Sequence, residues 1–151
     1  MNALVAPESI CNDAPMTASD SIELIRAPQL TDRAPYAYAA VVSGIRRLVF
    51  TAGACPLDED GTAVAVGDVA GQAEQVMSNL RTALAAAGAD LTDVVKTTVY
   101  VASHDRDDLV TAWDVVSRHF GAHDVPSTLL GVAVLGYRDQ LVEVEAVAAL
   151  G

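Results

Sequence analysis

The sequence predicts an α+β fold in which two helices cover one face of a mixed six-stranded sheet. Three observations lead to this prediction. A chain of 151 residues is long enough for one domain with its own core. A hydrophobic fraction of 52% with 19% charged residues excludes a disordered chain. Segments with strand-like and helical periodicity then follow one another in the order β-β-β-α-β-α-β-β.

The domain is expected to occupy residues 21–151, after a flexible N-terminal tail at residues 1–20. The tail contains Pro7 and Pro15 among small polar residues and has neither a strand nor a helix period. It also lacks the basic and continuous apolar regions of a secretory signal. The longest near-apolar run, residues 129–135, is too short to cross a bilayer. We therefore expect a soluble, cytoplasmic protein.

Three strands are expected before the first helix. Residues 22–26 alternate between apolar and polar side chains, residues 38–42 indicate a second strand, and residues 47–52 are rich in strand-forming residues. Residues 43–46 include a Ser-Gly pair and have the length of a hairpin turn. The second and third strands are therefore expected to pair with each other.

Helical periodicity starts after Asp68, a good N-cap residue, and ends at Gly88, which suits the position after a helix. A second helix is expected between Asp107 and Gly121, because this segment has acidic residues at its start and basic residues at its end. The β-branched run at residues 94–101 indicates a strand between the two helices.

Two further strands, at residues 128–134 and 141–149, complete the predicted fold. The two helices can cover only one face of the resulting sheet. Because the chain has no further helical segment for the other face, we expect self-association to cover it.

The charge balance excludes two classes of partner. The chain has 20 acidic and 9 basic residues, which gives a formal net charge of -11, and Lys96 is its lone lysine. Nucleic-acid binding requires clustered Lys and Arg that displace counterions from phosphates, and the arginines here are scattered. We therefore expect no nucleic acid and no anionic membrane surface among the partners.

Several common site types are absent from the sequence. It contains no phosphate-binding glycine loop and no serine nucleophile elbow. His119 and His123 have the spacing of a helical metal pair, but Gly121 between them should end the helix, so no metal site is expected. Cys11 and Cys55 are too few for a disulfide framework, and we expect two thiols in a reducing compartment.

Three side chains near strand ends are candidates for pocket chemistry. Cys55 has no base or helix N-terminus beside it in the sequence, which favours a packed or pocket-lining thiol over a catalytic one. Glu143 and Glu145 are two residues apart in a strand and therefore share one face. Their spacing alone is typical of a solvated strand face.

A series of short strings runs through most of the domain: residues 34–36, 48–53, 67–69 with Gln72, 79–80 with Leu84, 87–89, 93–101, 125–126 and 142–148. In this order and spacing they resemble the Rid superfamily of reactive-intermediate deaminases, also called YjgF, RidA or L-PSP-like proteins. The resemblance covers residues 22–151. It implies a chorismate-mutase-like fold and a homotrimer with inward-facing sheets and a pocket between each pair of neighbouring subunits.

The resemblance also implies an activity, the hydrolysis of enamines and imines derived from amino acids to a keto acid and ammonia, without a cofactor. Such substrates are already reactive, so the protein needs only to hold them, position a water and move a proton. Tyr36, Gly53 and Glu143 match the family pattern. Tyr36 and Glu143 are the expected catalytic residues, with Glu143 as the acid–base group.

The chain departs from the family pattern where the substrate binds. Thr128 replaces the arginine of a Pro-x-Arg motif, which grips a substrate carboxylate bidentately. Ala52 replaces a serine, Ala54-Cys55 stands in place of a Gln-Ile pair, and Trp113 stands near the register of a pocket asparagine. The residues expected to contact the substrate are Gly53, Ala52, Cys55, Trp113, Thr128, Leu129, Leu130 and Arg138.

These departures lead to three hypotheses. The first is a Rid-like enzyme with altered substrate choice, acting on a less anionic imine, enamine or related intermediate, for example in specialised metabolism. The second is a housekeeping 2-imino acid deaminase whose anion grip has moved, for example to Arg138. The third is a catalytically inert, trimeric ligand-binding protein. The presence of Glu143 with Tyr36 favours an enzyme, and the net charge of -11 disfavours the ribonuclease activity also attached to this family.

Overall fold

The computed structural model describes residues 22–151, so the predicted tail and Cys11 lie outside the described residues. The order of strands and helices is the one predicted from the sequence, with a short 3-10 turn added. The elements are β1 (Ile22–Ile25), β2 (Ala39–Val42), β3 (Arg47–Phe50), α1 (Val69–Ala86), η2 (Leu91–Asp93), β4 (Val94–Val101), α2 (Arg106–Phe120), β5 (Ser127–Gly131) and β6 (Val142–Leu150).

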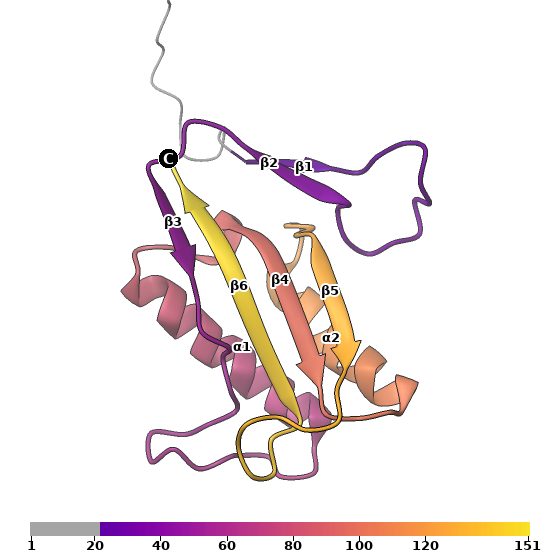
Figure 1. Cartoon of the computed structure of the whole chain (residues 1–151), viewed down its shortest axis with the longest axis vertical. Coiled ribbons are helices and arrows are strands. Elements are labelled where there is room, and N and C mark those ends of the chain that lie inside the picture. The colour runs from indigo at the N-terminus through magenta and orange to yellow at the C-terminus, as the bar shows by residue number, and fades with distance from the viewer. Residues whose placement is uncertain (1–21) are drawn as a thin grey trace, which may run out of the picture.

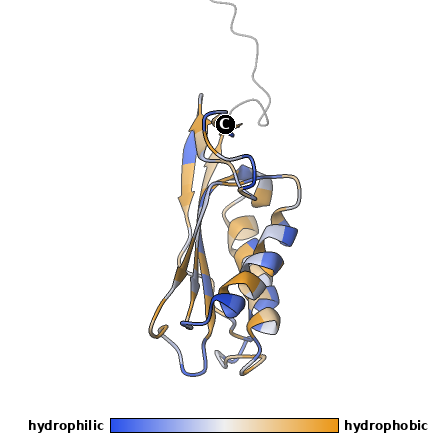
Figure 2. Ribbon diagram, turned by 90° about the vertical axis from the view of Figure 1, so that its right-hand side faces the viewer, coloured by the Kyte–Doolittle hydropathy of each residue, from blue (hydrophilic) through white to orange (hydrophobic). Residues whose placement is uncertain are grey.

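A four-stranded mixed sheet and two helices make the two layers of the fold (Figure 1). The strand order is β3-β6-β4-β5, in which β6 is antiparallel to both neighbours and β5 is parallel to β4. Helix α2 forms the crossover between the two parallel strands. Both helices lie on the same side of the sheet (Figure 2), which confirms the predicted fold class.

The six strands do not form one sheet, and the prediction of a hairpin at residues 43–46 is wrong. Strand β2 pairs with β1 in a separate two-stranded sheet that projects beyond the end of the larger one (Figure 1). Strand β3 pairs with β6, and the Arg46 N–H already donates to the Leu150 carbonyl at 2.8 Å. A positive φ of 67° at Gly44 bends the chain there. The bend therefore leads from one sheet to the other, because the long strand β6 offers a better partner than β2.

The core lies between the helices and the sheet, and alternation along the strands supplies it. Val142 and Val144 of β6 are fully buried, while Glu143 between them is only partly buried. The buried face of α1 includes Gln72 and Met77, whereas Ala83 is exposed. Neither helix in the described part of the chain is long and apolar enough to cross a membrane.

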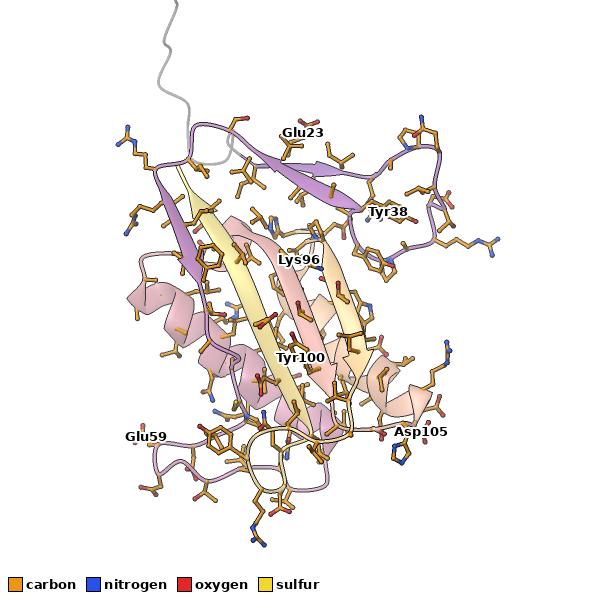
Figure 3. All side chains as sticks on the ribbon, in the orientation of Figure 1. Glu23, Tyr38, Glu59, Lys96, Tyr100 and Asp105 are labelled. Carbon is orange, nitrogen blue, oxygen red and sulfur yellow. The ribbon has the colours of Figure 1, made fainter. Side chains whose placement is uncertain are left out.

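The other face of the sheet carries large apolar side chains that no described element covers. Phe50 of β3 is 71% exposed, and Leu48 and Leu130 on the two edge strands are also exposed. Tyr100 and Lys96 lie on the same face of β4, on the side away from the helices (Figure 3). We refer to this surface, formed by β3, β6, β4 and β5, as the open face.

Candidate active site

The predicted site residues separate into two groups, one at each edge of the sheet. Gly53 and Cys55 follow the edge strand β3 and contact Glu143 on the neighbouring strand β6. Thr128 and Leu129 lie on β5, the opposite edge strand. Each group borders a cavity, and no residue lines both cavities.

We call the first group the glutamate cluster: Gly53, Cys55, Gln140 and Glu143. The Gln140 side-chain amide donates to Oε2 of Glu143 at 2.9 Å, and the Cys55 thiol approaches the same oxygen at 3.6 Å. A Cβ atom at Gly53 would overlap the Glu143 carboxyl group, so the carboxylate occupies space that only glycine leaves free. The cluster therefore fixes one carboxylate oxygen from two sides and packs the other against bare backbone.

Two buried glutamines hold the loop that precedes Glu143. The Gln140 Oε1 accepts from the Tyr137 N–H at 3.0 Å, and its amide also donates to the Val142 carbonyl at 3.3 Å. Gln72 of α1 donates to the Asp139 carbonyl and accepts from the Leu141 N–H, each at 2.7 Å. The loop is thereby fastened both to the strand that carries Glu143 and to the helix behind it.

Sequence reasoning missed Gln140 as a site residue. A glutamine three residues before Glu143, between a turn and a strand, carries little signal by itself. Its role depends on burial, since its side chain is almost fully enclosed and each of its polar atoms needs a partner.

A cavity of about 630 Å³ opens beside the glutamate cluster. Gly53, Cys55 and Tyr137 line it together with residues of α1. Asn79 of α1 donates to the carbonyls of Cys55 and Leu57 at 2.8 and 2.9 Å, which holds the segment after β3 in place. The cavity wall is therefore tied to the helix at two consecutive points.

The thiol of Cys55 stays protonated at neutral pH. Burial raises its pKa from 9.0 to about 11, and the negative charge of Glu143 adds to the effect. A thiolate nucleophile needs the opposite environment. Cys55 can therefore act as a weak hydrogen-bond donor toward Glu143 or as part of the cavity wall.

The second group of residues lines a cavity of about 450 Å³, which we call the aromatic cavity. Its lining residues are Pro35, Tyr36, Trp113, Ser127, Thr128 and Leu129. The rings of Tyr36 and Trp113 meet edge to face with centroids 6.1 Å apart, a favourable arrangement for aromatic pairs. Arg26 holds the segment before Tyr36 by donating to the carbonyls of Ala34 and Tyr36 at 2.7 and 3.0 Å.

Thr128 has a neighbour that the sequence did not reveal. The Lys96 Nζ on β4 donates to Oγ1 of Thr128 at 2.6 Å. Parallel pairing aligns Thr98 with Thr128, so Lys96 lies two residues from the position opposite it. Burial lowers the pKa of Lys96. In the sequence Lys96 stood out only as the lone lysine, because the parallel register that brings it to Thr128 spans a whole helix.

Four predicted residues do not belong to the lining of either cavity. Glu143 is one of them, although its neighbours Gly53 and Cys55 line the first cavity. Ala52 and Leu130 are exposed and lie outside both linings. Arg138 is exposed in the loop before β6 and makes no ion pair within residues 22–151.

The two histidines considered as a metal pair bind different partners. The His119 Nε2 contacts the Glu74 carboxylate and the His123 Nε2 contacts the Val94 carbonyl, each at 2.6 Å. Within residues 22–151 no three His, Cys, Asp or Glu side chains gather in a way that could hold a metal ion.

Comparison with known proteins shows the family to which the chain belongs and the activities named for its relatives. The family model described as Endoribonuclease L-PSP matches residues 28–150. A RutC family protein of Pyrococcus abyssi is 35% identical over 114 residues, which cover 76% of this chain and 85% of that protein. The 2-iminobutanoate/2-iminopropanoate deaminase of Salmonella typhimurium is 35% identical over 123 residues, covering 78% of this chain and 93% of the relative.

A solved structure supports the same relationship. The Rid-family protein YyfB of Yersinia pestis superposes with a TM-score of 0.80 at 27% identity, over 86% of this chain and 99% of that one.

Proposed function

Because this chain belongs to the Endoribonuclease L-PSP family, the Rid proteins, we propose that it hydrolyses small imines or enamines derived from amino acids. The observation that carries the proposal is the glutamate cluster, a carboxylate held by Gln140 and Cys55 at the edge of an open cavity. The deaminase activity in the names of the relatives needs a group of this kind, and no cofactor is part of the proposal.

Glu143 would move one proton in each half of the reaction. As a water oxygen bonds to the imine carbon, the Glu143 carboxylate takes a proton from that water and passes it to the imine nitrogen. The resulting carbinolamine then loses ammonia: the C–N bond breaks, its electron pair leaves with nitrogen, and Glu143 carries the hydroxyl proton to the departing group. The products are a keto acid and ammonia, and Glu143 returns to its starting state.

We propose that the active unit is a homotrimer whose pockets form between subunits. Two observations support this arrangement. The open face carries exposed apolar side chains, including Phe50, that a second copy would cover. The glutamate cluster and the aromatic cavity, with Tyr36 in its wall, lie at opposite edges of one chain, so the glutamate cluster of one copy can meet the aromatic cavity of the next.

We also propose that substrate choice differs from that of arginine-bearing relatives. Thr128 cannot neutralise a carboxylate as a bidentate arginine does. Trp113 adds a bulky aromatic wall beside it. A cytoplasmic location and a role in specialised metabolism belong to this proposal, and the neighbouring genes would test the latter. The family name, Endoribonuclease L-PSP, points to ribonuclease activity, which a net charge of -11 disfavours.

Subunit complementation tests the shared pocket. Glu143→Gln disables the glutamate cluster, and the double variant Tyr36→Ala/Trp113→Ala disables the aromatic cavity. When equal amounts are unfolded together and refolded as mixed trimers, about a quarter of pockets combine two intact halves, and about that fraction of 2-iminobutanoate hydrolysis should return. Mixtures that stay inactive would place the whole site within one chain. Light scattering should give a mass near three times 15.7 kDa for each sample.

A further inference from the structure

We propose that Lys96 supplies the positive charge that binds the carboxylate of the substrate, at the edge of the aromatic cavity beside Thr128. The inference rests on the proposed function and narrows its substrate class to small carboxylates such as 2-imino acids. It starts from the 2.6 Å hydrogen bond between the Lys96 Nζ and Oγ1 of Thr128. Thr128 also lines the aromatic cavity, whereas Lys96 lies in a neighbouring hollow that Glu145 borders as well, so Thr128 connects the ammonium group to the cavity wall.

The position of Lys96 makes it the cation available to this part of the sheet. Two basic residues occur in the described strands, Lys96 on β4 and Arg47 on β3. The Arg47 guanidinium lies close to Gly88, at the end of α1 on the helix side. Lys96 instead points from the open face, together with Tyr100 further along β4 (Figure 3). The substitution of arginine by Thr128 therefore leaves this edge with a cation on the neighbouring strand.

The charge of Lys96 has no carboxylate partner within residues 22–151. The ion pairs in that range join Arg26 to Asp124 and both Arg118 and His119 to Glu74. Glu145, the carboxylate opposite Thr98 on the same face, accepts a hydrogen bond from the Tyr100 hydroxyl at 3.0 Å. Partial burial of an unpaired ammonium is unfavourable, and an incoming anion would relieve it.

The chemistry of the Lys96–Thr128 pair suits a carboxylate. An ammonium has three donors, and Thr128 occupies one of them. A threonine hydroxyl that accepts from Lys96 can still donate its own proton to an anion. The pair therefore offers two kinds of donor to a carboxylate, although as a point charge it lacks the planar fork of an arginine. The lysine belongs to the string at residues 93–101 that resembles the family, so the new feature here is its threonine neighbour.

The single lysine allows a direct test in the intact protein. Lysine labelled with ¹⁵N at Nζ gives one side-chain ammonium signal, that of Lys96. Titration with 2-oxobutanoate, the keto acid expected from 2-iminobutanoate, should shift this signal, while the uncharged ketone 2-butanone should not. An ammonium signal that ignores 2-oxobutanoate at saturating concentration would overturn the inference.

Variants measure the size of the effect by calorimetry. Lys96→Met should weaken 2-oxobutanoate binding about tenfold to a hundredfold, the range for a charge-assisted hydrogen bond. Arg81→Met removes an equal charge from the exposed helix side and should bind like wild type. Lys96→Met/Thr128→Arg should recover binding, because the arginine then restores a cation at the cavity.

The outcomes separate this inference from the proposed function. Wild type that binds 2-oxobutanoate through Lys96 but hydrolyses no imine would remove the enzyme proposal and leave the anion site. Hydrolysis of 2-iminobutanoate at an unchanged KM in Lys96→Met would remove the anion site and leave the enzyme proposal. If Lys96→Met dissociates the trimer and the ammonium signal of wild type ignores 2-oxobutanoate, Lys96 binds a carboxylate of a neighbouring copy, and the inference is wrong.

Discussion

The glutamate cluster and the aromatic cavity differ in how much of each is organised within one chain. Gln140 in the preceding loop and Cys55 after β3 hold the carboxylate of Glu143, and the Gln72 amide ties that loop to α1. The aromatic cavity is formed by a loop, a helix and an edge strand. The side chains from these elements are held mainly by contacts between aromatic rings. A carboxylate that is held by directional hydrogen bonds tolerates little change, whereas a wall of packed rings can be rebuilt.

Departures from the family pattern occur on both sides of this comparison. On the glutamate side, Glu143 and Gly53 match the pattern and Cys55 departs from it. In the aromatic cavity, Tyr36 matches the pattern, whereas Trp113 and Thr128 depart from it. The carboxylate is therefore retained together with the glycine that leaves space for it, while the position of the carboxylate-binding arginine has changed.

The largest expected effect comes from removing the carboxylate itself. Glu143→Gln keeps the shape of the side chain but cannot accept or deliver a proton, so kcat on 2-iminobutanoate should fall by about 10²–10⁴. Glu145→Gln is the matched control, because Glu145 lies on the same strand face and contacts Tyr100 rather than the cluster. Equal activity of Glu143→Gln and wild type, both as folded trimers, would remove the glutamate cluster from the mechanism.

The second prediction concerns the reactivity of Cys55. A pKa of about 11 in place of 9.0 lowers its thiolate fraction at pH 7 about a hundredfold, so alkylation by iodoacetamide should be slower than that of a free thiol by about that factor. The rate should climb as the pH rises toward 11. The measurement uses Cys11→Ser, so that Cys55 is the one thiol followed.

Glu143→Gln sharpens this test. Because the charge of Glu143 contributes to the raised pKa of Cys55, its removal should speed alkylation. An unchanged rate would mean that burial alone protects the thiol.

The third prediction separates orientation of Glu143 from ordering of its loop. Gln140→Leu removes a donor worth about 1.5–3 kcal/mol to an ionised carboxylate, so kcat should fall about tenfold.

Gln72→Leu is the control for Gln140→Leu. It also removes two hydrogen bonds from the loop, to Asp139 and Leu141, but none to Glu143. Both variants should lower stability by a similar amount, about 1–3 kcal/mol for buried groups left unpaired. A fall of kcat in Gln72→Leu as large as in Gln140→Leu would show that loop order alone sets the activity.

Local signals in the sequence were sufficient for most of the fold. Helix α1 begins after its N-cap Asp68, whose side chain accepts from the Gly71 N–H at 3.0 Å, and Gly88 follows it with a positive φ of 75°. The pairing of strands was less predictable. Whether residues 43–46 close a hairpin depends on β6, which lies about a hundred residues later in the chain.

The residues of the candidate site also differ in how far the sequence alone could predict them. Glu143 and Gly53 could be predicted, because both match short strings of the family. Gln140 and Lys96 could not, since the contact of Gln140 with Glu143 and that of Lys96 with Thr128 arise only in the folded chain. Residues that work through a neighbour's side chain leave no periodic trace in the sequence.

The smallest expected effect lies at the link between the two halves, where Glu74 of α1 binds Arg118 and His119 of α2 at 2.7 and 2.6 Å. Hydrogen bonds from His119 and Arg118 lower the pKa of Glu74. Because the pKa of Glu74 is lower in the folded state than in the unfolded state, the ionised carboxylate stabilises the protein at pH values above its unfolded-state pKa of about 4.5. This contribution is lost as the pH falls through the folded-state pKa. Because the side chains of Glu74 and Arg118 are about half or more exposed, Glu74→Gln should cost only about 0.2–1 kcal/mol at pH 7 and nothing measurable at pH 3.

Urea unfolding of Glu74→Gln at the two pH values, beside the control Asp114→Asn, provides the measurement. Asp114 is also exposed but makes no ion pair within residues 22–151, so its variant should match wild type at both values. Activity should be unchanged, because each half of the site is held by its own contacts and the packed core keeps the helices aligned. A loss of activity in Glu74→Gln without a loss of stability would instead mean that the surface link sets the alignment of α1 and α2, and that the two halves are not independently organised.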